Sequence, residues 1–151
     1  MFSLFPKKTF LSEADNKRVV EAIRAGENRT SGEIRVFIES KNPLVSTLER
    51  AAFIFHQLQM HKTHHKNAVL IYIATDHHEL AIFADEGIFR AVGQDFWNRE
   101  VAQMLQHFKA HHLADGLIHC IRDVGELLSE KFPYIPTEDK NELPDEIVFG
   151  H

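Results

Sequence analysis

An unbroken run of apolar residues from Ala68 to Ala74 constrains the fold of this chain more than any other feature. A strand with one face in solvent alternates apolar and polar residues, whereas a continuous apolar run is typical of a strand covered on both faces. A second strand is predicted at 33–39, where apolar residues recur at every second position. The sequence therefore predicts a central sheet with helices on both sides.

Helices are predicted before, between and after these strands. Ser12 and Ser46 each have an acidic residue three positions later, a capping-box pattern that marks a helix start. The first helix is expected to end at Gly26 and the second near Met60. The second helix joins two successive strands, so those strands should be parallel with a right-handed β-α-β crossover.

The rest of the chain completes a layered domain. A third strand at 79–84 follows a turn at 76–78 and should return antiparallel as a hairpin. Helices follow from Glu86, with a break at Gly93. The predicted fold is a three-layer α/β/α sandwich with a mixed central sheet over residues 1–132. Residues 133–151 form an acidic, proline-containing tail that should dock on the same domain, because it keeps the apolar residues Ile135, Leu143, Ile147 and Phe149.

Composition excludes several classes of function. The formal net charge is −5, which argues against a nucleic-acid-binding protein because such proteins carry a basic face. A single cysteine, Cys120, excludes an intramolecular disulfide, and its apolar neighbours predict a buried, unreactive thiol. No segment matches a signal peptide or a membrane span, so a cytoplasmic location is expected.

Four stretches carry a resemblance to a known family. They are Arg29–Ile34, Asn67–Tyr72, Ala81–Ile88 and Asp115–Leu117. In order and spacing these stretches resemble the TPM domain family, which is related to a thylakoid-lumen acid phosphatase of photosystem II repair. The tail resembles that of its short, soluble bacterial members. Two departures are Asn67-Ala68, where many members have Asn-Gly, and Asp85-Glu86-Gly87, where many have a glycine-rich turn.

The resemblance implies both the fold and a range of activities. It implies an α/β domain, binding of a divalent cation such as calcium or magnesium, and a membrane or envelope protein as partner. It also implies acid phosphatase activity as one possibility. The sequence leaves open whether this chain is an enzyme and in what oligomeric state it works.

Topology places acidic residues at one edge of the predicted sheet. Glu33 begins the first strand, Asn67 precedes the second, and Asp85 ends the third, which runs the other way. Glu86 follows directly, and Asp95 opens the longer helix. Clustered carboxylates repel one another unless a cation neutralises them, and oxygen ligands favour hard cations. The predicted metal ligands are Glu33, Asp85, Glu86 and Asp95.

Two alternatives compete with this site. Glu86 and Asp95 also suit helix N-termini, where carboxylates are stabilised without any metal. Ligands of open α/β sheets usually lie beyond the carboxyl ends of parallel strands, which is the opposite edge. That edge carries Glu39, Ser40, Asp76, His77 and His78. The Asp85 edge is preferred because the family-like stretches gather there.

Histidines are abundant but fit no known zinc motif. His61, His64 and His65 share one loop, and no Cys-His or His-Glu-x-x-His pattern is present. Solvated loop histidines are the favoured interpretation.

Three functional hypotheses follow from the sequence. The first is a divalent-cation-binding domain with an interaction or regulatory role. The second is a metal-assisted acid phosphatase that hydrolyses phosphate monoesters, although only Arg29 and Arg90 lie near the acidic cluster in sequence. The third is a metal-free partner-binding domain. No catalytic residue is assigned.

Overall fold

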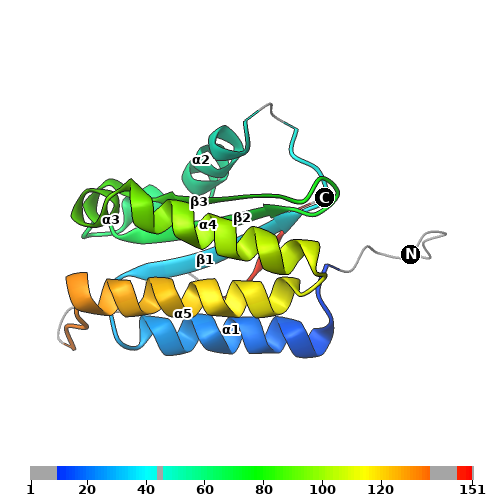
Figure 1. The fold of residues 1–151 in the computed structure, drawn as a ribbon. Helices are drawn as coiled ribbons and strands as arrows, with labels where there is room; N and C mark the ends of the chain where they lie inside the picture. The colour runs from blue at the N-terminus through cyan, green and yellow to red at the C-terminus, as the bar shows by residue number, and fades with distance from the viewer. Residues whose placement is uncertain (1–9, 44–45, 137–145, 151) are drawn as a thin grey trace, which may run out of the picture.

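A four-stranded mixed sheet forms the middle layer of the structure, a computed structural model that describes residues 10–43, 46–136 and 146–150 (Figure 1). The strand order is β3-β2-β1-β4. β1 pairs in parallel with both β2 and β4, while β2 pairs antiparallel with β3. The strands span Glu33–Glu39 (β1), Ala68–Ala74 (β2), Glu79–Ala84 (β3) and Val148–Phe149 (β4).

Helices cover both faces of the sheet. In Figure 1, α1 and α5 lie side by side on one face, α4 lies beside α5 over β3, and α2 lies on the other face. This arrangement confirms the predicted α/β/α architecture, including the β-α-β crossover and the hairpin. The helices span Glu13–Glu27 (α1), Thr47–Gln57 (α2), Glu86–Val92 (α3), Gln94–Lys109 (α4) and Leu113–Lys131 (α5), with a 3-10 turn at Met60–Lys62 (η1). No helix in the described part of the chain has the length and apolar character needed to cross a bilayer.

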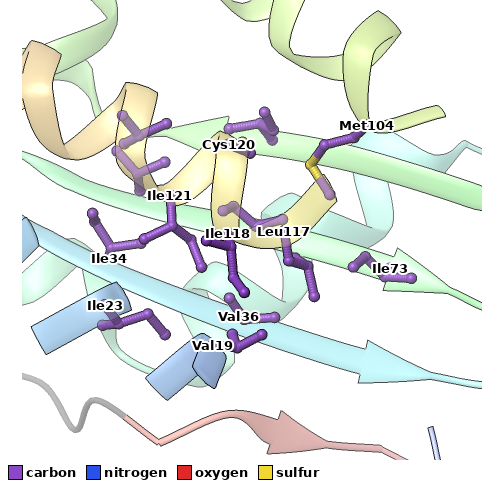
Figure 2. Close-up of a cluster of buried hydrophobic side chains, with 14 of the residues drawn as sticks. Val19, Ile23, Ile34, Val36, Ile73, Met104, Leu117, Ile118, Cys120 and Ile121 are labelled. Atoms are coloured by element: carbon purple, nitrogen blue, oxygen red, sulfur yellow. The ribbon is translucent and has the colours of Figure 1, made fainter. Parts of the chain in front are cut away.

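Strand alternation divides the core into two clusters. Ile34, Val36 and Ile38 of β1 face α1 and α5, and Figure 2 shows Ile34 and Val36 beside Leu117 and Ile121 of α5. On the other face, Leu70 and Tyr72 of β2 pack with α2. Every residue of β2 is buried, which confirms that this strand is central and covered on both faces.

Local sequence signals set most helix ends. Ser12 and Ser46 are N-caps, as predicted, and their hydroxyls accept from the backbone N–H groups three residues later. Gly93 separates α3 from α4 with a φ of 89°, a conformation that favours glycine. Two ends differ from expectation. α1 continues one residue past Gly26, and α2 stops at Gln57 because Gln59 turns into the left-handed region at a φ of 60°.

The tail contributes a strand that periodicity did not predict. β4 pairs with Phe37 and Ile38 of β1, and the backbone N–H of Gly150 donates to the Ile38 carbonyl at 2.7 Å. Ile147 is buried, and the ring of Phe149 stacks on Phe10 with centroids 5.9 Å apart. Residues 137–145, which include Leu143, lie outside the described residues, so docking of the whole tail stays a prediction.

A matched pair of leucine truncations tests this core. Leu70→Ala should lower the free energy of unfolding by about 2–5 kcal/mol, since it opens a cavity between β2 and α2. Leu48→Ala removes the same atoms from a side chain that is 55% exposed, so it should cost about 0.5 kcal/mol or less. Urea denaturation measures both, and equal losses would contradict the assignment of β2 as the buried centre.

Candidate functional site

Three segments meet at the sheet edge where β1 begins and β3 ends. The backbone N–H of Glu33 donates to the Asn67 carbonyl at 3.4 Å, and that of Asp85 donates to the Ala68 carbonyl at 2.9 Å. The structure therefore brings Glu33, Asn67 and Asp85 to one edge of the sheet.

Gly87 allows the loop before β2 to lie directly against the start of α3. Its backbone N–H donates to the Lys66 carbonyl at 2.9 Å. A Cβ at this position would lie 2.6 Å from the carbonyl oxygens of both His65 and Lys66, which is closer than a side-chain carbon can approach. Glycine at position 87 thus fixes the distance between Asn67 and the helix that Asp85 caps.

Two buried side-chain oxygens at this edge have no hydrogen-bond partner among the described residues. Asn67 is fully buried, and its amide nitrogen donates to Ser31 Oγ at 3.2 Å, which leaves Oδ1 unpartnered. Asp85 accepts from the Glu86 N–H through Oδ1 at 2.7 Å, which leaves Oδ2 buried and unpartnered. A buried acceptor without a partner costs free energy, so both atoms are suited to a bound cation or a donor.

The four predicted ligands do not gather into one cluster. Glu33 is buried at the same edge as Asp85, but Glu86 is exposed and forms an ion pair with Arg90 at 2.6 Å, one helical turn along α3. Asp95 lies in the exposed first turn of α4 and is separated from Asp85 along the chain by the whole of α3. Within 10–43, 46–136 and 146–150, no three His, Cys, Asp or Glu side chains are grouped closely enough to hold a metal ion.

The opposite edge contains a buried carboxylate whose charge is already compensated. Arg50 of α2 donates to both oxygens of Glu39, at 2.8 and 2.9 Å, and the Tyr72 hydroxyl donates to the same carboxylate. Burial, reinforced by Glu39, raises the pKa of Tyr72 above its ordinary value, so the phenol stays protonated. These contacts attach α2 to the carboxyl ends of the parallel strands. The sequence singled out Glu39 but gave no signal that paired it with Arg50 or Tyr72.

A second buried acid lies between α4 and α5. Glu100 is only 4% exposed, and burial, with Asp123 beside it, raises its pKa to about 8. Burial and the neighbouring Glu100 also raise the pKa of the Cys120 thiol, which is consistent with the predicted unreactive cysteine. A sequence signal for Glu100 existed, since it shares the buried face of α4 with Trp97 and Met104.

Comparison with known families gives one match over most of the chain. The sequence model of the TPM domain matches residues 5–127. A comparison with curated proteins finds no match.

Solved structures give related folds. The BA42 protein from the psychrophilic bacterium Bizionia argentinensis is 36% identical, with a TM-score of 0.87 over 96% of this chain and 99% of that one. An N-terminal domain from P. gingivalis is 18% identical, with a TM-score of 0.65 over 81% of this chain and 78% of that one. The N-terminal domain of the cg2496 protein from Corynebacterium glutamicum is 10% identical, with a TM-score of 0.56 over 99% and 94%. The last two show similarity of fold alone.

The buried Glu100 generates a prediction about pH. Its pKa rises from an ordinary value of 4.5 to about 8 on folding. The contribution of the neutral Glu100 carboxyl to the free energy of unfolding is therefore fully present below about pH 4.5 and is lost as the pH rises towards 8. Glu100→Gln cannot ionise, and it should raise the free energy of unfolding by roughly 1–3 kcal/mol near pH 8 with little effect near pH 4. Urea denaturation across this range measures the difference. Glu130→Gln, at an exposed position of α5, serves as the control and should show no such trend.

Proposed function

Because this chain belongs to the TPM domain family, we propose that it is a divalent-cation-binding domain with an interaction or regulatory role. The cation, calcium or magnesium, binds at the edge of the sheet where β1 begins. The observation that carries this proposal is a pair of buried oxygens, Asn67 Oδ1 and Asp85 Oδ2, that no described residue hydrogen-bonds. They lie on segments that hydrogen-bond to each other.

The donor set fits a hard cation. Asn67 Oδ1 and the Asp85 and Glu33 carboxylates are oxygen donors, the ligand type that calcium and magnesium prefer. Two carboxylates supply the negative charge, and the neutral amide adds a ligand without further repulsion. Calcium takes six to eight oxygens, so backbone carbonyls and water would complete its coordination. Glu86 and Asp95 contribute to the electrostatic potential from outside this set.

Binding at this edge would couple three elements. The ligands belong to the start of β1, the loop before β2 and the N-cap of α3. A cation shared among them would neutralise the carboxylates and hold these segments in one arrangement. Cation occupancy would therefore be transmitted to α3, which is exposed over much of its length.

An interaction role is supported by the outer surface of α2. Leu48 and Phe53 are more than half exposed there, and the Arg50 guanidinium lies 5.4 Å from the centre of the Phe53 ring. Large apolar side chains exposed on one helix offer contacts to a protein partner. We propose a membrane or envelope protein for this role, the class of partner that the family resemblance implies.

Hydrolysis of phosphate monoesters is the second candidate. In that reaction the cation would polarise phosphoryl oxygens, and basic side chains would bind the remaining charge. Arg90 is paired with Glu86, and a guanidinium nitrogen of Arg29 lies near Gly125 of α5 instead. The geometry thus favours cation binding over catalysis.

The test is calcium titration of the wild type and of Asp85→Asn by calorimetry. Asparagine caps helices as well as aspartate does, so the substitution keeps the start of α3 and removes one charge. Calcium affinity should fall at least about 10-fold, and the metal-free variant should melt at the same or a higher temperature, since carboxylate repulsion is relieved.

Asp95→Asn is the matched control, because it removes the same charge from an exposed helix start. It should leave the calcium affinity within about twofold of wild type, a difference of less than 0.5 kcal/mol. Identical binding curves for wild type and Asp85→Asn would refute this site. Phosphate release from a generic ester that depends on both the cation and Asp85 would instead favour the hydrolase.

A further inference from the structure

Two histidine rings lie close together across the contact between α4 and α5. The centroids of His107 and His119 are 6.2 Å apart, and the ring planes are inclined by 30°. His107 is half-buried, whereas the side chain of His119 is 51% exposed. The His107 ring is therefore partly enclosed by its neighbours, whereas the His119 ring is accessible to solvent.

The hydrogen bond of His107 fixes which nitrogen can act as a ligand. Its Nδ1 lies 3.0 Å from the backbone carbonyl oxygen of Gln103. A carbonyl only accepts, so Nδ1 carries the proton and the lone pair of the neutral ring is on Nε2. A hydrogen bond such as the one His107 makes, on the nitrogen away from a metal, orients an imidazole ligand. His119 Nδ1 lies 3.8 Å from Asp123 Oδ2, which is an ion-pair distance and longer than a hydrogen bond.

Gly116 of α5 provides the close approach that this pair needs. A Cβ on Gly116 would lie 2.7 Å from the Cβ of His107, so a larger residue would displace the histidine. Gly116 and His119 are three residues apart in α5 and share one face of the helix. One face of α5 thus leaves space for His107 at Gly116 and also carries His119.

The rings are close enough for a small movement to bring both onto one metal ion. Metal–nitrogen distances of about 2.0–2.1 Å place the centroids of two imidazoles on a tetrahedral ion roughly 5 Å apart, so the exposed His119 ring would move towards His107 by about 1 Å on binding. We propose that His107 and His119 form a two-imidazole site for a divalent transition metal such as zinc, completed by water. Asp123 is an ion-pair neighbour of His119 rather than a third ligand, since no group of three such side chains is found in the part of the chain that the structure describes.

This site differs from the proposed hard-cation site in chemistry and in place. Imidazole nitrogen favours zinc, nickel and copper, whereas calcium and magnesium prefer oxygen. The residues come from α4 and α5 rather than from the sheet edge at Asp85. Each site can therefore be tested without the other.

The experiment is a titration with Zn²⁺ alone, followed through the imidazole signals in ¹H–¹⁵N NMR spectra. In the wild type, the Nε2 signals of His107 and His119 should shift together at the same zinc concentrations, and calcium should leave them unchanged. In His119→Gln the shift of His107 should require at least 10-fold more zinc, and in His107→Gln the same should hold for His119. The interdependence of the two signals is the central readout, because other histidines in the chain can also bind zinc.

Two controls separate this proposal from its alternatives. His77→Gln, at an exposed turn, should leave the zinc shifts of both rings unchanged. Asp85→Asn should also leave them unchanged, so failure of the calcium site would not affect the result. Shifts of His107 in His119→Gln at wild-type zinc concentrations, or no shift of either ring in the wild type, would overturn the proposal. A thermal melt of His119→Gln verifies that the variant is folded, which its exposure leads us to expect.

Discussion

The parallel pairing of β1 with β2 determines where the two polar edges of the sheet lie. The register runs from Glu33 opposite Ala68 to Glu39 opposite Ala74, and both strands are buried on two faces. Burial on both faces fixes the register firmly, because a slip of one residue would move every side chain to the wrong cluster. Two parallel strands of equal length that pair in register have their starts at one edge of the sheet and their ends at the other. The chemistry of each edge then depends on the residues just outside the apolar run.

The two edges use buried polar groups in opposite ways. At the ends of the strands, Glu39 receives two hydrogen bonds from Arg50 and one from Tyr72, so its charge is compensated within the chain. At their starts, Asn67 and Asp85 each keep a buried oxygen that no described residue satisfies. A compensated ion pair contributes to holding α2 in place, whereas unsatisfied acceptors reduce stability until something binds them. The general rule for open α/β sheets places ligands at the strand ends, and in this molecule the polar groups favour the starts.

Local features of the sequence predicted most of the fold, whereas contacts between distant segments limited prediction of the sites. The caps at Ser12 and Ser46 depend only on residues within one helical turn, so their sequence signals were sufficient. β4 has two residues, too few for any periodicity, and its partner strand lies far away in the chain. Topology placed Glu33 and Asp85 at one edge but did not give the direction of each side chain. The Glu86 carboxylate forms an ion pair with Arg90. The Asn67 amide nitrogen donates to Ser31, and this bond sets the direction in which the side-chain oxygen of Asn67 points.

β4 also limits how far the sheet can extend. It covers the outer edge of β1 at Phe37 and Ile38, and the Gly150 N–H extends that cover by one further bond to Ile38. Without β4, an apolar inner strand would become an edge strand with unpaired N–H and C=O groups, a template for pairing with another chain. A pairing this short is easily opened, and β4 of one copy can then replace that of another. Strand exchange between copies, with each β1 completed by a neighbour's C-terminal segment, is therefore an assembly error that this topology permits.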